Sequence, residues 1–252
     1  MNEQNKKTIG AIILAAGLGR RMNSTMLKVM HLLHGKPLID YVVSTVEKVQ
    51  FDRKPTVIVC NDDPSVQNFL GKRADYAVQV ERLGTGHAVA VAEQQLRSEV
   101  SNIVILYGDM PFISGDSVRR LVERHIERNN TITMMTVTVP DFSDWRAAFL
   151  TFGRVIRGAD GHIVRSIEKK DCTPEELNIT ELNPCVYCFK SDWLWDNIKT
   201  LKNNNAQQEY YLTDLIQLAI EQGAKISSIS IEPQEAVGIN SQADLKTAEI
   251  LL

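Results

Sequence analysis

Apolar residues follow two alternating patterns along the first half of the chain. Short runs rich in valine and isoleucine are typical of strands buried on both faces, and they lie at residues 8–15, 56–60, 76–80, 102–108 and 131–139. The segments between them show the apolar spacing of amphipathic helices, at residues 37–49, 64–71, 84–96 and 114–129. The alternation predicts an α/β fold, with a doubly wound, mostly parallel, Rossmann-like sheet that has helices on both faces.

The pattern changes after about residue 140. Residues 152–171 contain two short strand patterns around the turn signal GADG, and residues 179–189 are a further strand candidate. The remaining elements are predicted as two helices, a strand and a closing helix, at 191–201, 211–222, 225–232 and 241–252. We therefore expect a single domain over residues 1–252, with a small β-rich substrate lobe at 141–240.

Composition and charge narrow the class of protein. The 252 residues are 44% hydrophobic, which supports a sizeable core, and the net charge of −3 gives no general attraction to nucleic acid or to an anionic membrane. The apolar stretch after the polar N-terminus is too short to span a bilayer, so we expect a cytoplasmic protein. No disulfide spacing relates Cys60, Cys172, Cys185 and Cys188, which we expect to be free thiols. No sequence feature fixes an oligomeric state.

The first predicted strand runs into a glycine-rich loop, AAGLGRRM, at residues 15–22. Glycines allow a ligand to approach the backbone closely, and two arginines indicate that the ligand is an anion. The loop does not match the dinucleotide fingerprint, because Met22 stands where the third glycine would be. It does not match the P-loop either, because GRR lacks the Gly-Lys-Ser/Thr sequence.

The loop and Lys28 resemble the signature of the sugar-1-phosphate nucleotidyltransferases, in particular the N-acetylglucosamine-1-phosphate uridyltransferases. Six further segments match in the same order and extend the resemblance over nearly the whole chain: QVERLGTGHA (79–88), LYGDMP (106–111), FGRV (152–155), EKKD (168–171), NNNAQQEYYLTD (203–214) and GIN (238–240). The resemblance implies that UTP and N-acetylglucosamine 1-phosphate react to give UDP-N-acetylglucosamine and pyrophosphate. It also makes residues 1–140 the mainly nucleotide-binding half and 141–240 the sugar-binding lobe.

The same resemblance implies a role for individual residues. Arg21, Lys28 and Asp109 would be catalytic, and Asp109 with Asn240 would hold Mg²⁺, which takes few protein oxygens. Nucleotide binding would fall to Leu14, Ala15, Ala16, Gly17, Gly19, Gln79, Gly84, Thr85, Tyr107 and Gly108. The sugar would be bound by Gly153, Glu168, Asn183, Tyr210 and Thr213.

Other interpretations of these residues stay open from the sequence. Asn240 precedes a predicted helix and could be its cap, and exposed arginines and lysines are usually solvated surface charges. The chain also departs from the family, with Arg20 in place of a threonine, Leu27 in place of a proline, and Pro184-Cys185 in place of Thr-Gly. Two alternatives therefore stay open. The chain could be a related enzyme that uses another nucleotide such as CTP or another phosphorylated acceptor, or it could be a catalytically silent nucleotide-sugar-binding protein. No β-helix repeats follow residue 252, so we expect no acetyltransferase activity in this chain.

Overall fold

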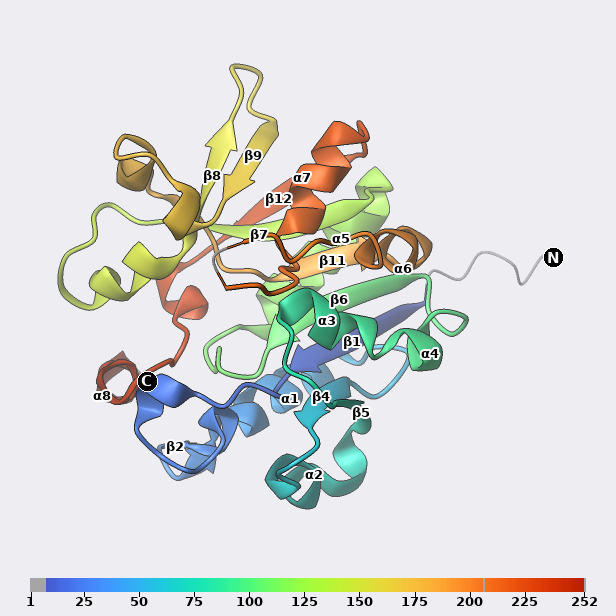
Figure 1. Cartoon of the computed structure of the whole chain (residues 1–252), viewed down its shortest axis with the longest axis vertical. Helices are drawn as coiled ribbons and strands as arrows, with labels where there is room; N and C mark the ends of the chain where they lie inside the picture. Colours follow the sequence, from blue (N-terminus) through green and yellow to red (C-terminus); the bar gives the residue numbers. More distant parts are fainter. Residues whose placement is uncertain (1–7, 206, 252) are drawn as a thin grey trace.

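The computed structural model describes residues 8–205 and 207–251, and for Arg20 it describes the backbone only. Within these residues one ten-stranded mixed sheet runs in the order β5-β4-β1-β6-β11-β7-β10-β8-β9, with β12 paired to β7 (Figure 1). The strands are β1 (Ile9–Leu14), β4 (Thr56–Cys60), β5 (Asp75–Gln79), β6 (Asn102–Tyr107), β7 (Ile132–Thr138), β8 (Gly153–Arg157), β9 (Ile163–Ile167), β10 (Glu181–Asn183), β11 (Tyr187–Lys190) and β12 (Ile226–Ile231).

The expected α/β fold is confirmed. Strands β5, β4, β1 and β6 are parallel neighbours, and β4 and β6 are buried almost throughout, as their unbroken apolar runs predict. The helices are α1 (Leu38–Val49), α2 (Ser65–Leu70), α3 (Thr85–Ala90), α4 (Glu93–Leu96), α5 (Gly115–Arg128), α6 (Ser191–Ile198), α7 (Asp214–Glu221) and α8 (Gln242–Leu251). A short hairpin, β2 (Leu32–Leu33) with β3 (Lys36–Pro37), precedes α1.

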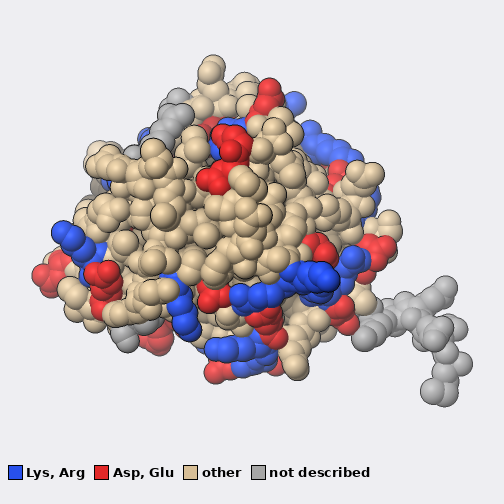
Figure 2. All heavy atoms as spheres, turned by 90° about the horizontal axis from the view of Figure 1, so that it is seen from below, with Lys and Arg blue, Asp and Glu red and all other residues tan. Residues whose placement is uncertain are grey.

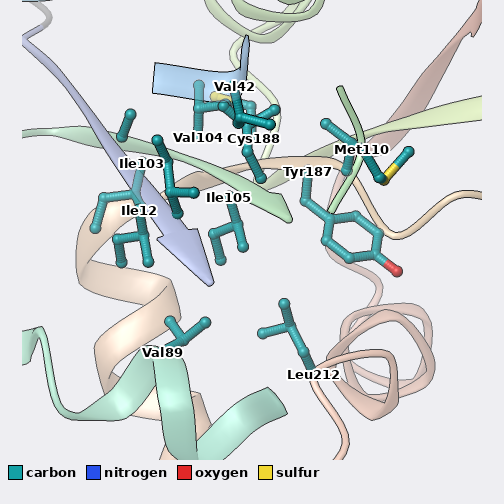
Figure 3. Packing of buried hydrophobic residues seen from close by; sticks show 14 of the residues in the cluster. Ile12, Val42, Val89, Ile103, Val104, Ile105, Met110, Tyr187, Cys188 and Leu212 are labelled. Atoms are coloured by element: carbon teal, nitrogen blue, oxygen red, sulfur yellow. The ribbon is translucent and has the colours of Figure 1, made fainter. Parts of the chain in front are cut away.

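The core lies between the sheet and the helices on its two faces. Val42 of α1 lies on one side of the central strands, while Val89 of α3 and Leu212 lie on the other (Figure 3). Residues 103–105 of β6 are fully buried and face alternate sides, as the pleat of a strand requires. Packing on both faces fixes the central strands, and therefore fixes the loops that leave their ends.

Two predicted elements are divided in the structure. The helix expected over 84–96 is interrupted after Ala90 and resumes at Glu93. The strand expected over 179–189 is wrong as a single element, because β10 pairs with β7 and β8 whereas β11 pairs with β6 and β7. Pro184 lacks the N–H that a ladder needs, and Cys185 has a left-handed φ of 63°, so the chain leaves one strand position and enters another.

The remaining predictions for the second half agree with the described residues. β8 and β9 form an antiparallel hairpin around the GADG turn, and α8 closes the chain as far as Leu251, with Leu252 and residues 1–7 outside the described part. The four cysteines are free, and no helix between residues 8 and 251, Ala206 excepted, is long and apolar enough to cross a membrane. Figure 2 shows one face on which positive and negative side chains are interspersed.

Candidate active site

The glycine-rich loop and the end of β6 meet at one edge of the sheet. Leu14, the last residue of β1, pairs in parallel with Tyr107, the last residue of β6. The loop after β1 and Asp109 after β6 therefore open on the same edge, which is where open α/β sheets bind ligands. A cavity of about 460 Å³ lies there.

This cavity is lined by almost all of the residues expected to bind the nucleotide. Of that set only Gly108 is absent from its wall, and the members present are Leu14, Ala15, Ala16, Gly17, Gly19, Gln79, Gly84, Thr85 and Tyr107. Gly108 instead packs tightly, since a Cβ added there would lie 2.9 Å from the Ile39 Cδ1 atom and 3.0 Å from the Leu14 carbonyl oxygen. Lys28, Asp109 and Arg82 are among the other residues of the wall.

Gly19 gives the loop its close contact with Lys28. Its φ of +62° is in the left-handed region, and a Cβ built on it would lie 2.5 Å from the Cβ of Lys28. A side chain at this position would therefore be strained twice, by the backbone angle and by the clash. The glycine lets the stem of Lys28 pass against the loop and enter the cavity.

The ammonium group of Lys28 lies between the two expected metal ligands. It donates a charge-assisted hydrogen bond to the Asp109 carboxylate and another, of 2.9 Å, to the Asn240 side-chain oxygen. The Lys28 and Asp109 side chains are only 17% and 10% exposed. Residues 28, 109 and 240 are distant in sequence, so this contact joins three segments of the chain at one point.

The side chain of Asn240 does not cap helix α8, contrary to the alternative interpretation of this residue. Ser241 performs that function, because its hydroxyl accepts from the Asp244 N–H at 3.2 Å, while the Asp244 carboxylate accepts from the Asn240 N–H at 2.9 Å. The Asn240 side chain is thus left to face Lys28 and Asp109. Its backbone is fixed by the cap.

Gln79 lines the 460 Å³ cavity and is 4% exposed. Its amide nitrogen donates to the Gly84 carbonyl oxygen and lies 3.1 Å from the His87 ring nitrogen Nδ1. Gly84 adopts φ +108°, where a Cβ would lie 2.7 Å from the Tyr210 carbonyl oxygen. The Gln79 side chain is therefore held rigidly against the cavity wall.

The segment after residue 209 closes on this loop through the backbone. Tyr210 donates to the Leu83 carbonyl oxygen at 2.8 Å and accepts from the Gly86 N–H at 2.7 Å, and the Thr85 hydroxyl accepts from the Leu212 N–H at 3.0 Å. Tyr210, expected at the sugar, is not among the residues that line the cavities described here. Its peptide groups instead hold the loop at residues 83–86 in place.

A second cavity, of about 230 Å³, adjoins the first. Three of the expected sugar-binding residues line it, namely Gly153, Glu168 and Asn183, together with Cys185 and Asn240. Lys28, Tyr107 and Asp109 line both this cavity and the 460 Å³ cavity. The three side chains therefore stand at the junction between the two spaces.

Arg21 is placed differently from Lys28. It is exposed, and it lines a third cavity, of about 630 Å³, together with Glu168, Lys169, Lys170 and Thr213. The Thr213 hydroxyl donates to the Glu168 carboxylate at 2.8 Å, which fixes that carboxylate at the pocket wall. Lys28 therefore lies at the junction, whereas Arg21 lines the neighbouring 630 Å³ cavity, which shares Tyr107 with the first two.

Tyr107 contributes a neutral hydrogen-bonding group at the junction. Burial raises the pKa of its phenol well above its usual range, and the nearby Cys185, Glu168 and Asp109 act in the same direction. The hydroxyl therefore stays protonated at neutral pH and can donate to an anionic ligand.

Sequence reasoning missed Arg82 and Cys185. The Arg82 guanidinium donates to the Ala16 carbonyl oxygen at 2.9 Å and pairs with Asp62 at 2.5 Å, so it lies along the glycine-rich loop. Arg82 lies inside the motif at residues 79–88, and this position could have marked it as a candidate site residue. Its hydrogen bond to Ala16 could not be predicted, because it depends on the tertiary structure. The sequence predicts Cys185 only as a free thiol and as a departure from the family pattern, because its position in the cavity wall depends on its left-handed backbone angle.

Comparison with known proteins identifies the class. The family model for the MobA-like NTP transferase domain matches residues 11–211. The chain belongs to this family and is a nucleotidyltransferase, which confirms the resemblance seen in its motifs.

Curated proteins to which the chain is similar include several named "Bifunctional protein GlmU". It is 37% identical to one from Clostridium botulinum (strain Loch Maree / Type A3) over 242 residues, which are 96% of this chain and 51% of the relative. It is 38% identical to the protein of that name from Shouchella clausii over 240 residues, with 95% and 51% covered. The chain thus spans about half the length of the curated relatives it matches.

Two solved structures support the fold. A candidate glucose-1-phosphate thymidylyltransferase from Bacillus anthracis, in complex with a sucrose, superimposes with a TM-score of 0.78 at 20% identity, over 97% of this chain and 95% of that one. A CMP:2-keto-3-deoxy-manno-octonic acid synthetase complexed with CTP gives 0.71 at 18% identity, over 97% and 98%.

The close packing of Gly19 on Lys28 gives a testable prediction. Gly19→Ala should lower the free energy of unfolding by clearly more than Gly35→Ala, by roughly 1 kcal/mol or more, because both carry a positive-φ penalty but only Gly19 adds the clash. Gly35 has φ +78° and open space around its Cβ position, so it is the matched control. Urea denaturation of the two variants measures the difference, and equal losses would contradict the contact between Gly19 and Lys28.

Proposed function

We propose that this nucleotidyltransferase joins UTP to N-acetylglucosamine 1-phosphate, giving UDP-N-acetylglucosamine and pyrophosphate. The observation that carries the proposal is the pair of adjoining cavities that share Lys28, Tyr107 and Asp109 as a common wall. One cavity is lined by the glycine-rich loop and suits a nucleoside triphosphate. The other is lined by Glu168 and Asn240 and suits a polar sugar.

The reaction suits a site of this kind. An oxygen of the sugar phosphate attacks the α-phosphorus of the nucleotide, the new P–O bond forms, and the bond to the bridging oxygen breaks to release pyrophosphate. The attacking phosphate, with a second pKa of about 6, is already largely ionised at neutral pH, so no general base is needed. Catalysis then depends on alignment of the two substrates and on neutralisation of their charge.

Lys28 and Arg21 would supply the positive side chains. Lys28 stands at the junction, where the α-phosphorus must lie if the base enters the 460 Å³ cavity and the sugar the 230 Å³ cavity. Arg21, in the wall of the 630 Å³ cavity, would reach phosphate oxygens from there. Backbone N–H groups of the loop at Gly17–Gly19 would hold the remaining phosphates, as glycine-rich loops do.

A divalent cation fits the oxygen ligands at the junction. The Asp109 carboxylate and the Asn240 amide oxygen both reach the ammonium group of Lys28, so their oxygens converge on one point where a cation is accommodated. One or two protein oxygens, with phosphates and water, are the usual ligands of Mg²⁺. In the described residues no group of three or more His, Cys, Asp or Glu side chains could hold a metal. Mg²⁺ bound to Asp109 and Asn240 would neutralise charge on the approaching phosphates.

Base choice would depend on Gln79. The side-chain oxygen of a glutamine can accept a hydrogen bond from the ring N–H of uracil, a group that cytosine lacks at that position. The Gln79 amide nitrogen is already engaged by Gly84 and His87, which orients the amide oxygen as the acceptor for the uracil N–H. The backbone around Ala15 and Ala16 lines the same cavity and would contact the base closely.

The direct experiment is a pyrophosphate-release assay with the four ribonucleoside triphosphates, several sugar 1-phosphates and Mg²⁺. We expect the highest turnover with UTP and N-acetylglucosamine 1-phosphate. Asp109→Asn should reduce it by about 100-fold or more in a folded protein, because the amide keeps the shape and loses the charge. Asp75→Asn, an exposed carboxylate on edge strand β5, is the control. Faster turnover with CTP would overturn the base assignment, and inactivity with every pair would favour a silent binding protein.

A second prediction separates nucleotide from sugar recognition. Gln79→Ala should weaken UTP binding about tenfold or more, since an unmade hydrogen bond to a buried base costs about 1–3 kcal/mol, and should change the KM for the sugar phosphate much less. Gln94→Ala, on the exposed face of α4, is the matched control. Equal losses for both substrates would show that Gln79 acts through the fold.

A further inference from the structure

The wall between the sugar-side cavities carries a side chain that the proposed mechanism does not use. Cys185 lines both the 230 Å³ cavity, beside Gly153 and Asn183, and the 630 Å³ cavity, beside Arg21 and Thr213. It precedes β11 and lies at the point where the chain passes from β10 to β11. Its side chain therefore occupies the boundary between the two spaces.

The backbone of Cys185 is in a conformation that side chains disfavour. Its φ is +63°, in the left-handed region, where the Cβ of an L-residue approaches its own carbonyl oxygen and glycine is the usual occupant. Non-glycine residues persist there only when their surroundings hold them, and they cluster at ligand sites. A strained cysteine in a cavity wall is thus a candidate for a functional side chain.

The surroundings of Cys185 do hold it. The Asn183 side-chain oxygen accepts from the Cys185 N–H at 2.9 Å, which closes a tight turn over Pro184. The Asn183 amide nitrogen donates to the Ser166 hydroxyl at 3.1 Å and to the Tyr187 hydroxyl at 2.8 Å. Asn183 is 2% exposed, and these partners use its hydrogen-bonding capacity inside the protein. Its position beside the sugar cavity therefore serves to fix Cys185.

The thiol of Cys185 is suited to line a cavity, and it is a poor nucleophile because it is protonated. Burial raises its pKa to about 12, and the Glu168 carboxylate acts in the same direction. The thiol is therefore neutral at physiological pH, and its sulfur lies 3.7 Å from the Asn183 carbonyl oxygen, to which it donates. A neutral, polarisable group adds volume and apolar surface without adding charge.

We propose that Cys185 is a specificity-determining residue of the acceptor pocket, whose side chain limits the size of the substituent that the acceptor sugar can carry. The inference rests on the proposed function, which places the sugar in the 230 Å³ cavity. The strained backbone directs the Cβ and the sulfur into the seam between the two cavities. Removal of the side chain would join the smaller space to the larger and admit a longer substituent.

The experiment compares N-acetylglucosamine 1-phosphate with its N-butanoyl analogue as acceptors for wild type, Cys185→Gly and Cys185→Ala. In wild type we expect a strong preference, in kcat/KM, for the N-acetyl compound. Cys185→Gly should lower the preference about tenfold or more, the scale on which a hydrophobic pocket discriminates substituent size. Cys185→Ala retains the backbone strain and removes only the sulfur, so it should lower the preference by a smaller factor.

Cys185→Ser is the matched control, because its hydroxyl keeps a γ atom in the cavity wall although this atom is smaller than sulfur, and it should lower the preference less than Cys185→Ala does. An unchanged preference in the glycine and alanine variants would overturn the inference, as would a loss in the serine variant equal to that of glycine. Failure of the proposed function is distinguishable, because wild type would then release no pyrophosphate with either acceptor. Thermal melting of each variant confirms that the compared proteins are folded.

Discussion

The contact on which the site depends is the Lys28 ammonium group held between Asp109 and Asn240. Each partner comes from a different part of the chain: Lys28 from the segment after the glycine-rich loop, Asp109 from the turn after β6, and Asn240 from the turn before α8. Parallel pairing of β1 with β6 brings the first two to one sheet edge, and the Ser241 cap positions the third. The 460 Å³ cavity and the 230 Å³ cavity meet at this contact, since Lys28 and Asp109 line both.

Charge explains why such an arrangement suits the proposed chemistry. Two phosphate-bearing substrates repel each other, so the junction needs positive charge that is partly shielded from water. In the absence of substrate, the hydrogen bonds to Asp109 and Asn240 stabilise the positive charge of Lys28 at the junction, where it is available to phosphate groups. A divalent cation would compete with the Lys28 ammonium group for the same two oxygens. Lys28 would therefore have to give up these hydrogen bonds when the metal binds. We expect lysine release and metal binding to be coupled.

The apolar pattern predicts the sheet and its flanking helices, because buried strands and amphipathic helices leave local signals. The family resemblance, and not the pattern, points to the nine residues of the expected nucleotide set that line the 460 Å³ cavity. The division of residues 179–189 into β10 and β11 was not predicted, since it depends on Pro184 and on a left-handed Cys185 that only tertiary contacts hold. The reach of Arg82 to Ala16 and the capping of α8 by Ser241 rather than Asn240 likewise depend on contacts between distant segments. Local patterns place such residues near a site without fixing what their side chains touch.

Competition between Lys28 and a divalent cation for Asp109 and Asn240 is tested most directly by titrating the ligand-free protein with Mn²⁺ and following the free Mn²⁺ by electron paramagnetic resonance. Lys28→Met removes the ammonium and keeps the length of the side chain, so Mn²⁺ should bind roughly tenfold more tightly than to wild type, equivalent to about 1.4 kcal/mol. Lys36→Met, an exposed lysine in β3, should leave the affinity unchanged, and Asp109→Asn should abolish binding. Equal or weaker Mn²⁺ binding by a folded Lys28→Met variant would contradict the account.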